Sequence, residues 1–150
     1  MESEKPSRII NRIYLSSLRV AGNEKVLKSL NITHVLTVCP IRPPHFADIT
    51  YKLISISDSP TQSITPYFPE CFSFIHSSVS TNGSILIHCF QGISRSVSIL
   101  LAYLMTFHQM SLPRALFYTK QRRPQINPNF GFINQLKSYE STLSLTNYPQ

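Results

Sequence analysis

The chain has 150 residues, 42% of them hydrophobic, with 14 Lys and Arg against 7 Asp and Glu. This length is ordinary for one globular domain that buries most of its apolar surface. The net charge of +7 favours phosphorylated or otherwise acidic partners. No apolar run is long enough to cross a membrane, and the first residues lack the apolar core of a signal peptide. We therefore expect a cytoplasmic protein, with the nucleus as a second compartment, that does not insert into membranes.

The cysteines and histidines give no sign of a disulfide framework or of a metal site. Cys39, Cys71 and Cys89 form no Cys-x-x-Cys pair. The histidines lack the spacing of metal ligands. We expect a reducing compartment, no metal and no cofactor.

The longest basic run is Lys-Gln-Arg-Arg at residues 120–123. It ends a helical pattern, and cations are favourable there because they offset the helix dipole. We interpret the whole run, Arg123 included, as a solvated helix end. It is not a signal for nucleic acid, and no nucleic-acid partner is expected.

The first half of the chain predicts several strands and one short helix. Residues 9–16 predict a short strand or a pair of strands, and residues 34–39 and 51–56 predict two more. Asn23 is a candidate N-cap for the helix. The apolar positions of that helix are Val26, Leu27 and Leu30.

The second half predicts four helices and one strand. A helix is expected from about residue 68 to residue 79, a strand buried on both faces at residues 85–87, and a buried helix over residues 97–105. Ser111 can cap the next helix, and Asn127, with a proline following at the first helical position, begins the last. The apolar stripes of the first and last of these helices are Phe68, Cys71, Phe72, Ile75 and Val79, and Phe132, Leu136, Tyr139 and Leu143.

Strands that alternate with helices predict an α/β fold. We expect a central, mostly parallel (mixed) sheet of four to five strands, flanked by helices, with the functional site at its carboxyl edge. There is no internal repeat, so residues 1–150 are expected to form a single domain with a core of about residues 8–145.

The sequence between the buried strand and the buried helix, His-Cys-Phe-Gln-Gly-Ile-Ser-Arg-Ser at residues 88–96, carries the chemistry. Five residues between Cys89 and Arg95 allow the backbone to curl with its amides pointing inward, and such a ring at a helix N-terminus binds a tetrahedral oxyanion. Gly92 supplies conformational freedom. Arg95 can grip two phosphate oxygens. The same field favours the thiolate of Cys89, which makes it a nucleophile.

The pattern His-Cys-x5-Arg-Ser resembles the signature of the cysteine-dependent protein tyrosine phosphatases, and its Ser-Arg-Ser ending resembles the dual-specificity branch. Ala-Tyr-Leu-Met at residues 102–105 and the segment at residues 123–136 are similar to further segments of that branch. The resemblance spans about residues 8–145 and is nearest to the small atypical members. It implies a protein tyrosine phosphatase-like fold and phosphorylated protein substrates.

The resemblance implies roles for residues of the signature and of one earlier loop. Cys89 is the expected nucleophile, and Arg95 is expected to bind phosphate. Asp58, in the loop after a strand, is the expected general acid, while its rival Asp48 precedes that strand and should lie at the opposite edge. Ser96 can donate to the thiolate. The remaining phosphate-binding residues are expected to be Phe90, Gln91, Gly92, Ile93 and Ser94.

Three further residues have supporting interpretations. His88 is expected to hold the shape of the loop through hydrogen bonds to backbone carbonyls rather than to act as a base. Asn129 resembles a family residue that braces the loop, and it equally fits an ordinary helix-start asparagine. Cys39 is similar in position to a cysteine of the tensin-type lipid phosphatases that pairs with the nucleophile on oxidation, and a buried packing thiol is the alternative.

We therefore expect a protein phosphatase, a hydrolase of cellular signalling, that acts on phosphotyrosine and on phosphoserine or phosphothreonine through a cysteinyl-phosphate. With few residues before the first strand, the pocket should be shallow. Two alternatives stay open: a phosphatase of RNA 5′-phosphates or phosphoinositides, and a scaffold that binds phosphoproteins without turnover.

Overall fold

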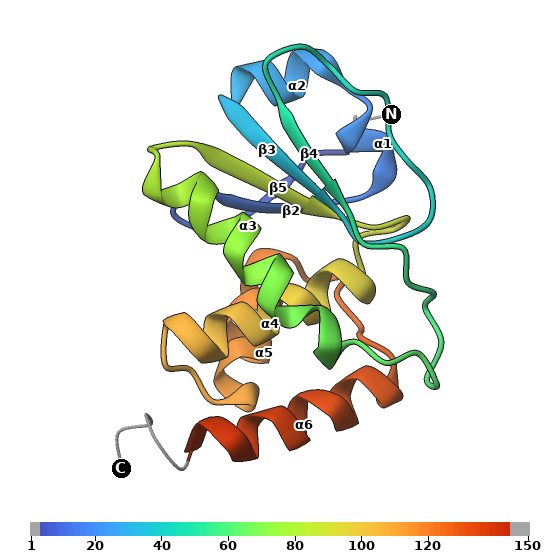
Figure 1. Ribbon diagram of the computed structural model, residues 1–150, viewed down its shortest axis with the longest axis vertical. Helices are drawn as coiled ribbons and strands as arrows, with labels where there is room; N and C mark the ends of the chain where they lie inside the picture. The colour runs from blue at the N-terminus through green and yellow to red at the C-terminus, as the bar shows by residue number, and fades with distance from the viewer. Residues whose placement is uncertain (1–3, 145–150) are drawn as a thin grey trace.

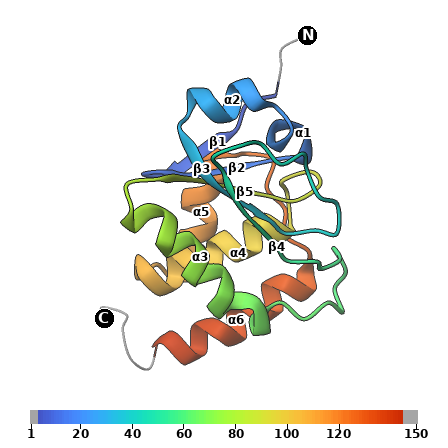
Figure 2. The same cartoon turned by 45° about the horizontal axis from the view of Figure 1, so that its top comes forward.

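The computed structural model describes residues 4–144. One five-stranded sheet, in the order β1-β2-β5-β3-β4, lies between two layers of helices. Helices α1 and α2 cover one face, and helices α3 to α6 cover the other (Figures 1 and 2). The strands are β1 (Ser7–Ile10), β2 (Ile13–Ser16), β3 (Ile32–Thr37), β4 (Thr50–Leu53) and β5 (Ser84–His88). The helices are α1 (Leu18–Ala21), α2 (Glu24–Ser29), the 3-10 turn η1 (Thr65–Tyr67), α3 (Phe68–Ser80), α4 (Arg95–Phe107), α5 (Leu112–Arg122) and α6 (Phe130–Ser144).

The predicted α/β architecture is confirmed, with five strands in a mixed sheet. Strands β1 and β2 form an antiparallel pair, and β2, β5, β3 and β4 run parallel to one another. His88 at the end of β5 is paired with Ser16 of β2 and with Thr37 of β3. Because these three strands end level, the loops that follow them meet at one edge of the sheet.

The predicted helix caps at Asn23 and Ser111 are present. Asn23 Oδ1 accepts a hydrogen bond from the backbone N–H of Val26 at 3.3 Å, which begins α2. Ser111 Oγ accepts one from the N–H of Arg114 at 3.2 Å, which begins α5. Both caps are local, and a local interaction can be inferred from sequence alone.

The predicted start of the last helix is wrong. Helix α6 begins at Phe130, and its cap is Asn129, whose Oδ1 accepts from the N–H of Phe132 at 2.9 Å. The N–H of Asn127 instead donates to the carbonyl of Ile93 at 2.9 Å. Asn127 is therefore held against the loop after β5, and the helix starts later.

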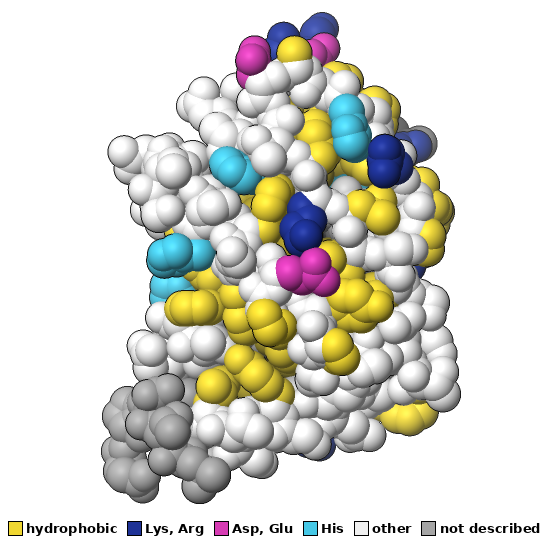
Figure 3. All heavy atoms as spheres, in the orientation of Figure 1, with side chains coloured by type: hydrophobic (Ala, Val, Ile, Leu, Met, Phe, Trp, Pro, Cys, Tyr) yellow, Lys and Arg dark blue, Asp and Glu magenta, His cyan; other side chains and the backbone are white. Residues whose placement is uncertain are grey.

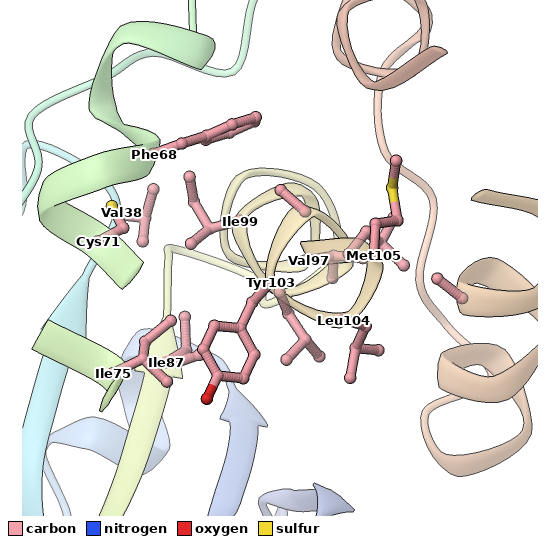
Figure 4. Close-up of a cluster of buried hydrophobic side chains, with 14 of the residues drawn as sticks. Val38, Phe68, Cys71, Ile75, Ile87, Val97, Ile99, Tyr103, Leu104 and Met105 are labelled. Carbon is pink, nitrogen blue, oxygen red and sulfur yellow. The ribbon is translucent and has the colours of Figure 1, made fainter. Parts of the chain in front are cut away.

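Helix α4 runs through the centre of the larger core, as the continuous apolar sequence predicts. Figure 4 shows its side chains surrounded by residues of β5 and α3. The burial of Cys71 in this core raises the pKa of its thiol to about 12, so it is inert at neutral pH. The labelled members of the cluster are Val38, Phe68, Cys71, Ile75, Ile87, Val97, Ile99, Tyr103, Leu104 and Met105.

Candidate active site

The loop from Cys89 to Arg95, here called the phosphate loop, joins β5 to α4 at the carboxyl edge of the parallel strands. It forms the wall of a small pocket with a volume of about 40 Å³. Asp58, from the loop after β4, lies at the same pocket. The structure thus brings together the predicted nucleophile, arginine and acid. The lining residues are Asp58, Cys89, Phe90, Gln91, Ile93, Ser94 and Arg95.

The Cys89 sulfur lies within a set of hydrogen-bond donors, and the residue as a whole is only 2% exposed. The N–H of Gly92 donates to Sγ at 3.2 Å, and Ser96 Oγ lies 3.2 Å from it. Burial on its own raises the pKa of this thiol. Hydrogen bonds from the Ser96 side chain and from the backbone of Ser96, Gly92 and Ile93 outweigh burial and lower the pKa below its ordinary value. Cys89 is therefore biased towards the thiolate.

The carbonyl groups of residues 90–93 in the phosphate loop accept hydrogen bonds from segments outside the loop. Two accept from backbone N–H groups of neighbouring segments, and two accept from a single guanidinium, that of Arg123. The bonds are Leu18 N to Phe90 O at 3.0 Å, Arg123 Nη2 to Gln91 O at 3.3 Å, Arg123 Nε to Gly92 O at 2.8 Å, and Asn127 N to Ile93 O at 2.9 Å.

Gly92 is required at the tightest point of this loop. Its φ of +70° lies in the left-handed region, which glycine tolerates best. A Cβ at this position would also collide with the carbonyl of Ser16 and with the guanidinium of Arg123. Both observations agree with the role that the sequence predicted for this glycine.

His88 supports the loop in neutral form. Its Nδ1 lies 3.0 Å from the carbonyl of Cys89, and its Nε2 lies 2.8 Å from Thr37 Oγ1. A carbonyl only accepts, so Nδ1 carries the proton and Nε2 accepts from the hydroxyl. Burial lowers the pKa of His88 to about 4. The imidazole is therefore uncharged near neutral pH and ties the ends of β5 and β3 together.

Arg95 begins α4 and points into the pocket. Its Nη1 donates to the carbonyl of Ile56 at 3.2 Å, which fixes the guanidinium against the chain that follows β4. Within residues 4–144, its buried Nε has no hydrogen-bond partner. That donor is therefore available to a phosphate oxygen.

Asn129 orients Asp58, a function that the sequence reasoning did not assign. Its Nδ2 donates to Asp58 Oδ1 at 2.8 Å, and its backbone N–H donates to Ser94 Oγ at 3.0 Å. The same side chain caps α6 through Phe132. One asparagine thus connects the acid, the phosphate loop and a helix. The two interpretations of Asn129 are therefore both correct.

The start of α6 also holds the acid loop, here defined as residues 54–64. A Cβ on Gly131 would collide with the backbone of Pro60, so glycine permits close contact between helix and loop. Gln135 of α6 binds the far end of the loop through two hydrogen bonds. Its Oε1 accepts from the N–H of Ile64 at 2.7 Å, and its Nε2 donates to the carbonyl of Gln62 at 2.8 Å.

The prediction of a solvated Arg123 is wrong. The residue is 1% exposed, and its guanidinium binds the phosphate loop on one side and the N-terminal segment on the other. The signal that could have found it was its place at the start of the segment that resembles the family, at residues 123–136. Basic composition alone pointed the other way.

Cys39 and Asp48 lie at opposite edges of the sheet. Cys39 follows β3 and is a buried free thiol. Its Sγ donates to the carbonyl oxygen of Ile41 at 3.5 Å. Burial raises its pKa more than the neighbouring groups lower it. Its disulfide with Cys89 on oxidation stays a prediction. Asp48 precedes β4 and lies away from the pocket, as expected.

The described part of the chain contains neither a candidate membrane-spanning helix nor a candidate metal site. No helix within residues 4–144 combines the length and the apolar composition needed to cross a membrane. The same residues contain no group of three or more His, Cys, Asp or Glu side chains arranged to hold a metal ion.

Comparison with known proteins places this geometry in a family. The family model described as "Dual specificity phosphatase, catalytic domain" matches residues 13–142. Dual specificity protein phosphatase 1 of Arabidopsis thaliana is 44% identical over 142 residues, which cover 94% of this chain and 72% of that protein. The solved structure of DUSP15 superposes with a TM-score of 0.90 at 34% identity and covers 95% of this chain and 91% of that one.

A second solved structure, of the human tyrosine phosphatase-like serine/threonine/tyrosine-interacting protein, gives a TM-score of 0.89 at 31% identity. It covers 95% of this chain and 99% of that one. The family model spans most of the chain, including Asp58, the phosphate loop and Asn129. The chain therefore belongs to the dual specificity phosphatase family.

Proposed function

We propose that this chain hydrolyses phosphate esters of tyrosine and of serine or threonine in proteins through a cysteinyl-phosphate intermediate. The observation that carries the proposal is the environment of the Cys89 sulfur. It is buried in the pocket, it is bound by inward-pointing amides and by Ser96, and its pKa is lowered. A thiolate below an oxyanion-binding loop is an activated nucleophile.

In the first step Cys89 Sγ attacks phosphorus in line with the leaving oxygen. The sulfur–phosphorus bond forms as the phosphorus–oxygen bond breaks, and the protein substrate leaves as an alcohol or phenol. Amides of the phosphate loop and the fork of Arg95 hold the equatorial oxygens. Asp58, positioned by Asn129, gives its proton to the leaving oxygen.

In the second step Asp58, now a carboxylate, accepts a proton from water. The water oxygen bonds to phosphorus, the sulfur–phosphorus bond breaks, and inorganic phosphate forms. Ser96 Oγ, 3.2 Å from Sγ, donates to the departing thiolate. The enzyme returns to its starting state, with a thiolate at Cys89 and a protonated Asp58.

The size of the pocket supports activity on both kinds of phosphoester. Its volume of about 40 Å³ leaves room for a phosphate group but cannot enclose an aromatic ring. Phe90 stands at the rim with 51% of its surface exposed. A pocket of this small volume supports a shallow site, which the short side chains of phosphoserine and phosphothreonine can also enter.

The charge around the pocket favours proteins over RNA 5′-phosphates and phosphoinositides. The side chains between Cys89 and Arg95 are uncharged. On the face that Figure 3 shows, basic side chains are scattered among apolar and acidic ones instead of forming one continuous basic surface. Within the phosphate loop itself, a polyanionic ligand would find no charged side chain between Cys89 and Arg95.

One of the similar solved structures is of a protein named as tyrosine phosphatase-like and serine/threonine/tyrosine-interacting. The experiment therefore includes binding without turnover, the scaffold alternative, among its outcomes. The experiment measures phosphate release by the full chain from four substrates: a phosphotyrosine peptide, a phosphothreonine peptide, a phosphoinositide and a 5′-triphosphorylated RNA. We expect release from both peptides, and none from Cys89→Ser with any substrate. Peptide binding without release would support the scaffold, and release only from lipid or RNA would change the substrate class.

A further inference from the structure

The guanidinium of Arg123 lies between the phosphate loop and the N-terminal segment. On the loop side, Nε donates to the carbonyl of Gly92 at 2.8 Å and Nη2 donates to that of Gln91 at 3.3 Å. On the other side, Nη1 donates to Ser7 Oγ at 3.0 Å, and Nη2 lies 3.5 Å from Glu4 Oε1. With 1% of its surface exposed, Arg123 cannot touch a substrate.

Each of the two peptide groups that Arg123 holds also carries an N–H that binds the sulfur. In a planar trans peptide, the C=O and the following N–H point in opposite directions. The carbonyl of Gln91 shares its peptide group with the N–H of Gly92, and the carbonyl of Gly92 shares its peptide group with the N–H of Ile93. Both N–H groups hydrogen-bond to the Cys89 sulfur and lower the pKa of its thiol.

The outer carbonyls of the loop do not depend on Arg123. Those of Phe90 and Ile93 are held by the backbone N–H groups of Leu18 and Asn127. Within residues 4–144, the carbonyls of Gln91 and Gly92 accept hydrogen bonds only from the Arg123 side chain. Removal of that side chain would therefore free the two central peptide groups to rotate, while the ends of the loop stayed in place.

The N-terminal segment completes the arrangement. Glu4 Oε2 accepts from Ser17 Oγ at 2.7 Å, so its carboxylate is fixed between Ser17 and Arg123. Burial lowers the pKa of Arg123, and the Glu4 carboxylate opposes this effect. An arginine stays protonated in proteins, so its positive charge faces the outer side of the loop.

We propose that Arg123 is a positioning residue that fixes the Gly92 and Ile93 amides on the Cys89 sulfur, and that Glu4 and Ser7 act through it as part of the active site. The proposal rests on the proposed function, because it assigns the thiolate a catalytic role. The charged or titratable groups that face Cys89 are Arg95, Asp58, Arg123 with Glu4, Cys39, and the neutral His88.

The test measures alkylation of Cys89 by iodoacetamide against pH in the full chain, with the modified peptide quantified by mass spectrometry. Arg123→Met removes the donors and keeps the apolar stem. We expect the midpoint of the alkylation curve to rise by about one pH unit, a tenfold loss of thiolate below the midpoint. Phosphate release should fall in parallel. Because alkylation needs no turnover, the result holds even if the proposed function fails.

Arg122→Met is the matched control. Arg122 is the neighbouring residue with the same charge, but it is exposed and lies over the ring of Tyr118, with its guanidinium carbon 3.4 Å from the ring centroid. We expect this variant to keep both the midpoint and the activity. Equal shifts of the alkylation midpoint in the two variants would show that the effect comes from net charge alone, and this would overturn the proposal.

Two milder variants keep the test valid if Arg123→Met does not fold. Arg123→Lys keeps the charge but cannot hold two carbonyls, so phosphate release should fall with a smaller change of midpoint. Glu4→Gln removes a negative charge beside Arg123, so the midpoint should shift slightly downwards, opposite to Arg123→Met. An unchanged midpoint in both Glu4→Gln and Arg123→Lys, with wild-type phosphate release, would overturn the proposal.

Discussion

At the scale of single residues, the side chains of the site divide into those that meet the phosphate and those that hold other side chains. Cys89, Arg95 and Asp58 belong to the first group, and Asn129 and Arg123 to the second. Sequence reasoning found the first group because chemistry restricts the residue types that can serve. It did not predict the contacts of the second group, because the residues to which Asn129 and Arg123 hydrogen-bond are far away in the sequence.

Asp58→Asn should lower the rate on a phosphopeptide by about 10²–10⁴-fold, the usual cost of losing a general acid. The loss should be large for a phosphoserine peptide and small for an aryl phosphate with a good leaving group, because only the first leaving group needs a proton. The measurement is kcat/KM on both substrates for both proteins.

Asp48→Asn is the control, because Asp48 carries the same group at the opposite edge of the sheet. It should keep the wild-type rate on both substrates. A comparable loss of rate in Asp48→Asn, or full activity in Asp58→Asn, would contradict the assignment of Asp58 as the acid.

Arg95→Lys should weaken phosphate binding and slow the chemical step, although the charge is kept. An ammonium cannot reproduce two parallel N–H donors or the contact of Nη1 with the Ile56 carbonyl. Both inhibition by inorganic phosphate and kcat/KM should drop at least tenfold. Arg114→Lys, on the exposed side of α5, should change neither. Comparable losses in the two variants would contradict the assignment.

At the scale of elements, most helices and strands follow from local sequence. The caps at Asn23 and Ser111 and the continuous apolar run of α4 are local features, and all three appear as predicted. The start of α6 was misplaced because the Asn127 N–H is taken by Ile93, far earlier in the chain. Arg123 was taken for a solvated residue for the same reason, since Gly92, Ser7 and Glu4 are all distant in sequence.

Asn129→Ala should affect the acid loop more than the phosphate loop. The rate should fall strongly for a phosphoserine peptide, whose leaving group needs a proton, and weakly for an aryl phosphate with a good leaving group. Loss of the cap should also cost about 1 kcal/mol of stability. Steady-state rates on the two substrates and urea unfolding measure both effects.

Asn23→Ala removes a comparable cap from α2, away from the pocket. It should lose similar stability and keep the ratio of the two rates. If Asn129→Ala also keeps that ratio, then Asn129 serves only as a cap and the orientation of Asp58 does not depend on it.

At the scale of the whole molecule, the site is assembled from segments at both ends of the chain. The N-terminal strands, the acid loop, the phosphate loop and α6 all contribute contacts. The mixed sheet brings them together because β2, β5 and β3 end at the same edge. Activity therefore depends on the packing of α6 against the core, although α6 supplies no catalytic side chain.

Phe132→Ala and Phe117→Ala form a matched pair for this packing. Phe132 is fully buried, whereas 67% of the surface of Phe117 is exposed. Phe132→Ala should lower the free energy of unfolding by about 3–5 kcal/mol. Phe117→Ala should change it by at most about 0.5 kcal/mol. Urea denaturation compares them, and equal losses would mean that α6 does not pack as described.

The central claim is that Cys89 carries the phosphoryl group during turnover. The direct measurement mixes the enzyme with a phosphopeptide labelled in its phosphate, quenches with denaturant within milliseconds, and locates protein-bound label by mass spectrometry. We predict transient label on the peptide that contains Cys89 in the wild-type protein. Cys39→Ser, measured under reducing conditions, should show the same label. Cys89→Ser should show no label and no phosphate release. Phosphate release at the wild-type rate without label on Cys89 would contradict the account.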